Sequence, residues 1–245
     1  MKKILAMVLA MVLAFAVAAT AEEAIEEERV FQPIKRGEWS DLTSEVQQKL
    51  KDLGYSIGNV DGIFGPKTEN GLKQLQGTLG LEETGAINTQ DEYDLIMSIS
   101  VSDGVNLASG TEEALTLEPS GENNWAKPLN FYSTSEQGLA LLKDPANKVF
   151  TVSFDWKITG ADTAVDAAVG LKYTDKLFAS VSASALTIEK GDSNGHFKAS
   201  FIPSDAMRQV GTGWLLYNIG AATENRGMKI EISNFVFEAG LDIAE

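Results

Sequence analysis

The sequence predicts an α+β protein in which a small three-helix bundle is followed by an antiparallel β-sandwich. Apolar residues recur at helical spacing between residues 40 and 99, which predicts amphipathic helices. After about Ser98, apolar and polar residues alternate in short runs separated by Gly, Ser and Asn, a pattern typical of strands joined by turns. A chain of 245 residues has room for two such domains. We therefore expect a helical domain at 40–99 and a β-sandwich at 100–245.

The segment before residue 40 has the features of a targeting signal followed by a leader. Lys2 and Lys3 precede an apolar run at 4–19, which ends in the cleavage-site pattern Ala19-Thr20-Ala21. These features predict a secretory signal peptide at 1–21, and the alternative of an uncleaved membrane anchor stays open. The run is shorter than the roughly 20 apolar residues of a membrane-spanning helix. We expect a secreted protein without a membrane span after cleavage, in which residues 22–39 form an acidic, flexible leader.

The composition excludes several classes of chemistry. The chain has no Cys and one His, with 35 acidic against 20 basic residues and a net charge of −15. The absence of Cys excludes disulfides, a Cys nucleophile and thiolate metal sites, and a single His excludes multi-histidine zinc sites. A net charge this negative argues against a nucleic-acid partner, because Lys and Arg supply that affinity. We expect no cofactor, and no ordered carboxylate loop assigns a metal, so a structural calcium ion is left open.

Three helices are expected in the first domain. The first begins near Asp41 and ends at Gly54, a residue suited to the left-handed conformation that follows a helix. The second begins at Pro66, a favoured first helical residue, and ends in the same way at Gly80. The third follows Asn88, whose side chain is expected to cap it. The apolar positions of these helices are Leu42, Val46, Leu50, Leu53, then Leu72, Leu75, Leu79, and last Tyr93, Leu95, Ile96 and Ile99.

The loop between the first two helices carries a dense motif, Val60-Asp61-Gly62-Ile63-Phe64-Gly65-Pro66-Lys67-Thr68. Together with Val46-Gln47, Leu53-Gly54-Tyr55, Leu75-Gln76, Gly80-Leu81 and Gly85, it resembles the peptidoglycan-binding domain of the three-helix type. The resemblance covers residues 40–99 and implies binding to the bacterial cell wall. The motif residues that it offers as peptidoglycan contacts are Asp61, Gly62, Phe64, Gly65 and Thr68.

Most of these motif residues also have a structural role available to them. Asp61 and Thr68 can satisfy free amides at the start of the second helix. Two positions in that helix depart from a good helical sequence: Gly71, where the family usually has Ala, and Gly77. Each Gly is expected to weaken the helix by about 0.5–1 kcal/mol, which predicts a looser second helix within the same fold.

The clearest strand of the second domain is 150–158, in which Phe150, Val152, Phe154, Trp156 and Ile158 share one face. The residues between them are polar, which predicts a sheet with one dry and one solvated face. Further strands are expected at 114–117, 167–173, 178–188, 197–201, 214–219 and 228–237. Several short strands of this kind predict a β-sandwich.

The closing strand at 228–240 and the sequence Gly195-His196-Phe197 are similar to those of jelly-roll, galactose-binding-like modules, a group that includes many carbohydrate-binding modules. The resemblance implies a sugar site built from aromatic rings and polar side chains. The candidate contacts are Trp125, Asp155, Lys157, Trp214 and Tyr217. Trp214 and Tyr217 have opposite parity, so we expect only one of them to face a ligand, and Trp156 is expected in the core.

Catalysis is the less favoured interpretation. A serine triad would need His196, which is expected to follow a turn at 191–195, and the chain has no Gly-x-Ser-x-Gly sequence. Glycoside cleavage needs two carboxylates about 5–10 Å apart, but no spacing of acidic residues selects a pair. We expect a non-catalytic, cell wall-associated protein that binds peptidoglycan and presents the sandwich to a second glycan or a protein. Two alternatives remain: a structural or adhesion protein whose helical domain packs on the sandwich, and a wall-glycan hydrolase.

Overall fold

The computed structural model describes residues 31–110, 114–116, 129–172, 178–217 and 228–242. Residues Ile34–Glu245 form one compact unit, and the unit before it, Met1–Pro33, lies almost entirely outside the described residues. The predicted signal peptide at 1–21 and the candidate contact Trp125 are also outside them. In the part of the chain that is described, no helix is long and apolar enough to cross a membrane.

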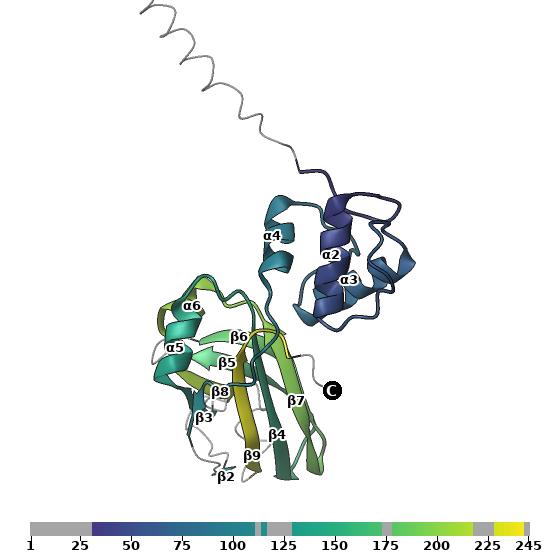
Figure 1. The fold of residues 1–245 in the computed structure, drawn as a ribbon. Coiled ribbons are helices and arrows are strands. Elements are labelled where there is room, and N and C mark those ends of the chain that lie inside the picture. The colour runs from purple at the N-terminus through teal and green to yellow at the C-terminus, as the bar shows by residue number, and fades with distance from the viewer. Residues whose placement is uncertain (1–30, 111–113, 117–128, 173–177, 218–227, 243–245) are drawn as a thin grey trace, which may run out of the picture. The chain divides into compact units, whose positions relative to one another are not determined.

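Three helices form the helical part, as the sequence predicts: α2 (Asp41–Asp52), α3 (Pro66–Thr78) and α4 (Gln90–Ser98) (Figure 1). Their apolar faces, with the residues of the connecting loops, make a small core whose members are Ile34, Val46, Leu50, Leu53, Ile57, Phe64, Leu72, Leu75, Leu79, Ile87, Ile96 and Ile99. Leu42 was expected on the buried face of α2 but is 38% exposed. It lies in the first turn of α2, where the neighbouring Thr43 is the buried residue.

Both long helices end at the predicted glycines. Gly54 has a φ of +83° and Gly80 a φ of +68°, a conformation that costs other residues about 1–2 kcal/mol. The residues that follow, Tyr55 and Leu81, donate their backbone N–H groups to carbonyls in the last turn of each helix, at 2.9 Å. These bonds satisfy groups that the end of a helix leaves unpaired.

The cap of α4 is one residue later than predicted. Thr89, not Asn88, is the N-cap, and its hydroxyl accepts a hydrogen bond from the backbone N–H of Glu92 at 3.2 Å. The Glu92 carboxylate in turn accepts from the backbone N–H of Asn88 at 2.9 Å. A Thr followed three residues later by Glu is a capping pair, and the sequence contained this signal.

The expected flexible leader is wrong for its last residues. Ile34 is buried and pairs with Ile87 through hydrogen bonds of 2.9 Å in both directions. Trp39 pairs with Ile63, and the backbone N–H of Phe64 donates to the carbonyl of Glu38 at 2.9 Å. Residues 34–40 therefore belong to the helical part, because they pair with the loops of this part.

The two glycines inside α3 do not interrupt it. Gly71 is buried, and a Cβ added there would stand 2.5 Å from Cγ2 of Ile57. A Cβ at Gly77 would meet only the flexible end of Glu83, with Oε1 at 2.6 Å. The sequence predicts that these glycines weaken α3. At Gly71 the missing side chain leaves room for Ile57.

The strands that follow the helical part form two antiparallel sheets that face each other (Figure 1). They make the predicted β-sandwich of jelly-roll type. One sheet has the order β1 (Ala108–Ser109), β3 (Leu129–Thr134), β8 (Gly213–Tyr217), β5 (Val165–Lys172) and β6 (Phe178–Ile188). The other has the order β2 (Ala114–Thr116), β9 (Lys229–Ala239), β4 (Phe150–Ala161) and β7 (Gly191–Phe201). All the pairings are antiparallel.

Aromatic rings fill the space between the sheets. Phe150 on β4 stacks on Phe237 of β9 with ring centroids 5.4 Å apart. Trp214 on β8 meets Phe237 edge to face at 5.0 Å, which joins the two sheets. Trp156 is 8% exposed, so its predicted place in the core is confirmed.

Two short helices of this part were not predicted, α5 (Glu136–Lys143) and α6 (Asp205–Val210). Each starts after a Ser cap, Ser135 and Ser204, whose hydroxyls accept backbone N–H groups three residues later at 3.0 and 3.3 Å. Helices of eight and six residues present too few turns for a helical period to show in the sequence.

Strand β7 begins six residues before the predicted one, since it spans Gly191–Phe201 rather than 197–201. The expected turn at 191–195 is therefore wrong, and His196 lies inside a strand, opposite Asp155 of β4. Residues 191–195 are small or polar and carry no apolar alternation. Gly195 pairs with Trp156, and a Cβ there would stand 2.7 Å from Cζ2 of that indole ring. A Gly at position 195 is therefore explained by the indole ring of Trp156 beside it and not by a turn.

We predict that Gly71→Ala lowers the free energy of unfolding by about 1–3 kcal/mol, because the added methyl overlaps the buried Ile57 side chain. Gly77→Ala is the matched control in the same helix, since only the mobile end of Glu83 has to move. It is expected to change stability by less than about 1 kcal/mol, in the stabilising direction. Urea unfolding followed by circular dichroism measures both. Equal effects of the two substitutions would contradict the role given to Ile57.

Candidate functional site

The motif loop is held by one buried amide, the side chain of Gln47 in α2, which is 1% exposed. Its Oε1 accepts the backbone N–H groups of Asp61 and Gly62 at 3.0 and 2.9 Å. Its Nε2 donates to the Asp61 carboxylate and to the Ile63 carbonyl, both at 3.0 Å, and contacts the Thr68 hydroxyl at 3.2 Å. A single glutamine thus satisfies both sides of the loop, and buried polar groups require such partners.

Asp61 belongs to this network through its carboxylate. Oδ1 accepts from the side-chain amide of Gln47 and from the backbone N–H of Ile63, each at 3.0 Å. Hydrogen bonds to the charged form, with that of Gln47 the larger cause, hold the pKa of Asp61 below its ordinary value of 3.8. Asp61 is therefore ionised across the physiological range, and one of its oxygens already binds the loop.

The five motif residues predicted as peptidoglycan contacts do not share one surface. Phe64 and Thr68 are 1% and 2% exposed, so they support the loop from inside. Gly62 is buried and adopts a φ of +74°, which favours Gly. Gly65 precedes α3 as its N-cap residue, and only Asp61 is exposed.

A second buried glutamine repeats the arrangement in α3. Gln76 is 0% exposed, and its Oε1 accepts the backbone N–H of Gly85 at 2.8 Å. Its Nε2 donates to the carbonyl of Ala86 at 3.0 Å and to the Glu92 carboxylate at 2.9 Å. The helical part therefore uses the same device twice, a helix glutamine that closes a loop around a Gly of positive φ.

Apolar side chains gather on the surface around the Gln47 loop. Four of the six large apolar residues that are exposed in the described part of the chain lie on the segments 39–42 and 60–63. They are Trp39 at 78%, Ile63 at 55%, Leu42 at 38% and Val60 at 37% exposure. The pairing of Trp39 with Ile63 joins the two segments. Trp39 was expected in a flexible leader, so its place beside the motif loop was not predicted from the sequence.

The open face of the four-stranded sheet carries a polar cluster on three strands. The Asp155 carboxylate on β4 accepts from Nδ1 of His196 on β7 at 2.7 Å. Its other oxygen accepts from Nδ2 of Asn234 on β9 at 2.6 Å. These bonds, with that of Asn234 the larger cause, hold the pKa of Asp155 below its ordinary value. Asp155 and His196 are half exposed, so the cluster faces solvent.

Asn234 reaches this cluster because β9 bulges. The pairing of β4 with β9 shifts between Ser153 and Asp155, which leaves an extra residue on β9. Asn234 has a φ of +52°, and among the described residues it is the one non-glycine with a positive φ. Asn tolerates this conformation better than most residues, and the bulge turns its side chain towards the carboxylate.

The other predicted sugar contacts separate into surface and core. Lys157 lies on the open face beside the cluster and forms an ion pair of 3.5 Å with Glu231 of β9. Trp214, in contrast, is fully buried between the sheets and has no exposed ring face. Tyr217 is half-buried at the end of β8, which agrees with the expectation that only one of the two rings faces outward.

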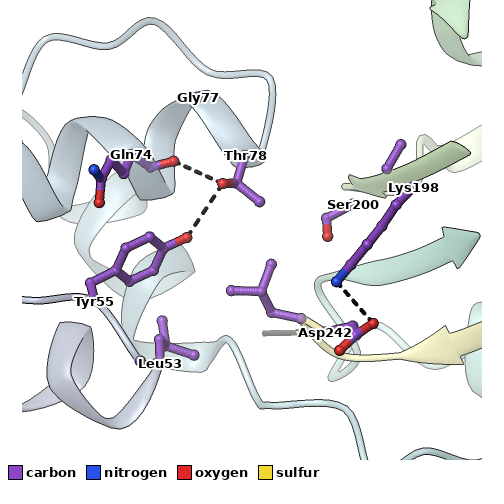
Figure 2. A pocket seen from close by; sticks show the side chains of 11 residues that line it. Leu53, Tyr55, Gln74, Gly77, Thr78, Lys198, Ser200 and Asp242 are labelled. Carbon is purple, nitrogen blue, oxygen red and sulfur yellow. Dashed lines mark hydrogen bonds and ion pairs between the residues drawn. The ribbon is translucent and has the colours of Figure 1, made fainter. Parts of the chain in front are cut away.

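A pocket in the unit Ile34–Glu245 brings together Tyr55, Thr78, Lys198 and Asp242 (Figure 2). Its polar groups bind one another. The Tyr55 hydroxyl donates to Thr78 Oγ1 at 3.4 Å, and the Thr78 hydroxyl donates to the Gln74 carbonyl at 2.8 Å (Figure 2). Lys198 forms an ion pair of 3.1 Å with Asp242. Among the described residues, no three His, Asp or Glu side chains come close enough to share a metal ion.

One segment of the helical part matches a known protein family. Residues 40–90 match the family described as "Putative peptidoglycan binding domain", which confirms the first resemblance. The match includes Gln47, Gln76 and the loop that Gln47 holds. It begins one residue after Trp39. No curated protein matches the chain.

Solved structures resemble the sandwich at a distance. One titled "CBM4 structure and function" shares 11% identity at a TM-score of 0.29, over 55% of this chain and 92% of that one. The N-terminal cellulose-binding domain of a β-1,4-glucanase from Cellulomonas fimi shares 12% at 0.30, over 59% and 98%. The VP2 subviral particle of infectious bursal disease virus shares 13% at 0.30, over 56% and 31%. Carbohydrate-binding modules are among these similar structures.

We predict that Gln47→Ala lowers the free energy of unfolding by about 2–3 kcal/mol, because it leaves the buried amides of the loop without partners. The neighbouring Gln48→Ala is the matched control. Gln48 is exposed and makes one bond, to Asp52 at 2.7 Å, so its loss is expected to cost less than about 0.5 kcal/mol. Urea unfolding of both variants measures the difference. A Gln47 variant as stable as the Gln48 variant would show that the loop does not depend on this amide.

We also predict that part of the stability depends on the charge of Asp61. Since the folded-state pKa lies below 3.8, the contribution is fully present above that value and is lost as the pH falls through the lower, folded-state pKa. Asp61→Asn has no such titration. The difference in unfolding free energy between wild type and D61N should therefore shrink between about pH 6 and about pH 2. A difference that stays constant over that range would contradict the pKa direction.

Proposed function

Since residues 40–90 belong to a family of peptidoglycan-binding domains, we propose that the chain is an exported, non-catalytic protein of the bacterial cell wall. The helical part binds peptidoglycan, and the β-sandwich presents its open polar face to a second glycan or to a protein. The observation that carries the proposal is the family match over the segment in which Gln47 holds the motif loop.

The charge of the chain determines how such binding would work. With a net charge of −15, the protein is not drawn by general electrostatics to a wall that is itself rich in carboxylates and phosphates. Affinity then comes from shape, stacking and local hydrogen bonds. Added salt screens the repulsion between like charges, so it should leave binding unchanged or strengthen it slightly.

The sandwich supports the second part of the proposal through the cluster of Asp155, His196 and Asn234. These side chains combine carboxylate, imidazole and amide groups on an exposed sheet face, beside Lys157 and Glu231. Carboxylates, imidazoles and amides are also the groups that bind sugar hydroxyls. Their hydrogen-bonded arrangement reduces the motion that a ligand would have to stop.

A catalytic role is the alternative of a different class. Hydrolysis of wall glycan would need two carboxylates about 5–10 Å apart beside a cleft, with the pKa of one of them raised. Among the described residues, the carboxylates whose pKa is shifted are Asp61, Glu69 and Asp155, and in all three the pKa is lowered, which suits permanent charge rather than proton donation. Release of reducing ends from purified sacculi by the full chain would establish hydrolysis and overturn the non-catalytic proposal.

We predict that the full chain pellets with purified peptidoglycan sacculi. The bound fraction should change by less than about twofold between low and high salt, because net charge opposes rather than drives binding. Co-sedimentation at several salt concentrations measures it. A chain that stays in the supernatant at every salt concentration would overturn the proposed function.

A variant of the sandwich serves as the control for that experiment. Asp155→Ala combined with Lys157→Ala should leave sacculus binding unchanged, because both residues lie outside the matched segment. The same double variant should lose any retardation that the wild type shows in native gels containing soluble xylan or β-glucan, whereas Lys229→Ala on β9 should not. A wild type that no polysaccharide or wall extract retards would remove the sugar role of the sandwich from the proposal.

A further inference from the structure

The side chain of Trp39 is the most exposed large apolar group in the described part of the chain, at 78%. A single exposed apolar residue is common on protein surfaces, but three more exposed apolar residues lie on the segments 39–42 and 60–63. These are Leu42, Val60 and Ile63, and together with Trp39 we call them the Trp39 patch. The patch lies around the loop that Gln47 holds, and Trp39 itself precedes the segment matched to the family.

The backbone under Trp39 is fixed on both sides. The N–H of Gly37 donates to the Phe64 carbonyl at 3.0 Å, and the N–H of Ser40 donates to the Gly62 carbonyl at 3.2 Å. Ser40 is also the N-cap of α2, where its hydroxyl accepts from the Thr43 N–H at 3.1 Å. The residue therefore cannot be regarded as part of a loose leader, since a short antiparallel ladder and a helix start hold it in place.

The indole ring of Trp39 lies beside Gly62 in the motif loop. A Cβ added at Gly62 would stand 3.4 Å from Nε1 of Trp39 and 2.9 Å from the hydroxyl oxygen of Ser44. The ring edge thus rests beside a buried glycine and a hydroxyl group, and most of the residue remains in solvent. An exposed aromatic ring on a fixed backbone, beside hydrogen-bonding groups, suits the C–H face of a sugar ring.

The size and charge of the patch favour a sugar over other occupants. Stable protein interfaces bury about 800 Å² on each partner and include about 20–30 residues a side, whereas the Trp39 patch has four. The residues around the ring include Glu38, Asp41 and Asp61, all exposed carboxylates. The stem peptides of peptidoglycan carry carboxylates themselves, so these groups would repel them. The N-acetylated sugars of the glycan strand are neutral where they would stack.

We propose that Trp39 is a saccharide-stacking residue through which the helical part binds the glycan strand of peptidoglycan, with the Trp39 patch as its contact surface. This inference rests on the proposed function and extends it, because the five motif residues support the loop and the exposed ring beside them makes the contact. Ile63 and Val60 would lie along the next sugar of the strand, and the Ser44 hydroxyl would bind its polar edge.

The test compares Trp39→Ala with Val105→Ala in the full chain. Val105 is similarly apolar and 40% exposed, but it lies outside the patch and outside the matched segment. Trp39→Ala should weaken co-sedimentation with sacculi by about tenfold or more, which corresponds to about 1.4 kcal/mol, and Val105→Ala should not. Trp39→Phe, which keeps a smaller ring, should bind with intermediate affinity. Urea unfolding of each variant shows whether a loss of binding is merely a loss of fold.

The occupant is identified with two soluble probes, peptide-free glycan strands and the free stem peptide. Glycan strands should quench or shift the tryptophan fluorescence of the wild type, and they should not change the fluorescence of Trp39→Phe. The stem peptide should not change the fluorescence of either protein. If wild type pellets with sacculi and Trp39→Ala pellets equally well, the inference is overturned and the proposed function stands. Binding of the stem peptide alone would overturn the choice of glycan. A wild type that fails to pellet overturns the proposed function itself.

Discussion

The buried side-chain amide of Gln47 is the interaction on which the rest of the helical part depends. It binds the backbone on both sides of the motif loop, so the loop has one conformation and its backbone needs no water. Gln76 does the same for the loop around Gly85. An amide can serve in this way because it donates and accepts at once, which neither a carboxylate nor an ammonium group can do. Gln47 and Gln76 therefore favour one arrangement of the small core, because their hydrogen bonds are satisfied only in that arrangement.

The fixed loop has a consequence for the surface. Because Gln47 holds Gly62 and Ile63, the ladder that pairs this segment with residues 37–40 is held as well, and Trp39 stays 78% exposed. In the proposed complex, binding would cost little backbone entropy, since hydrogen bonds already hold the backbone that carries Trp39. The motif and the proposed contact surface are therefore different residues, joined by backbone hydrogen bonds.

The sandwich reaches its polar cluster by a different physical route. Its core is a set of aromatic rings, among which Phe150, Trp214 and Phe237 connect the two sheets. The regular alternation of β9 is broken once, at the bulge that contains Asn234. This irregularity costs backbone energy, and the hydrogen bond to Asp155 offsets part of the cost. The cluster is thus a product of strand pairing, and no pattern of neighbouring residues encodes it.

The sequence by itself determined the elements whose signals are local. Helix starts and ends at Pro66, Gly54 and Gly80 follow from the conformations these residues allow, and the alternation at 150–158 follows from the pleat of a strand. Only the tertiary structure decided which polar residues are buried, because Gln47 and Gln48 are adjacent and look alike until their partners are known. It also placed His196 in a strand, removed Trp214 from the surface and brought Trp39 beside Gly62. Each of these depends on residues that are distant in the chain, and local propensity carries no information about such contacts.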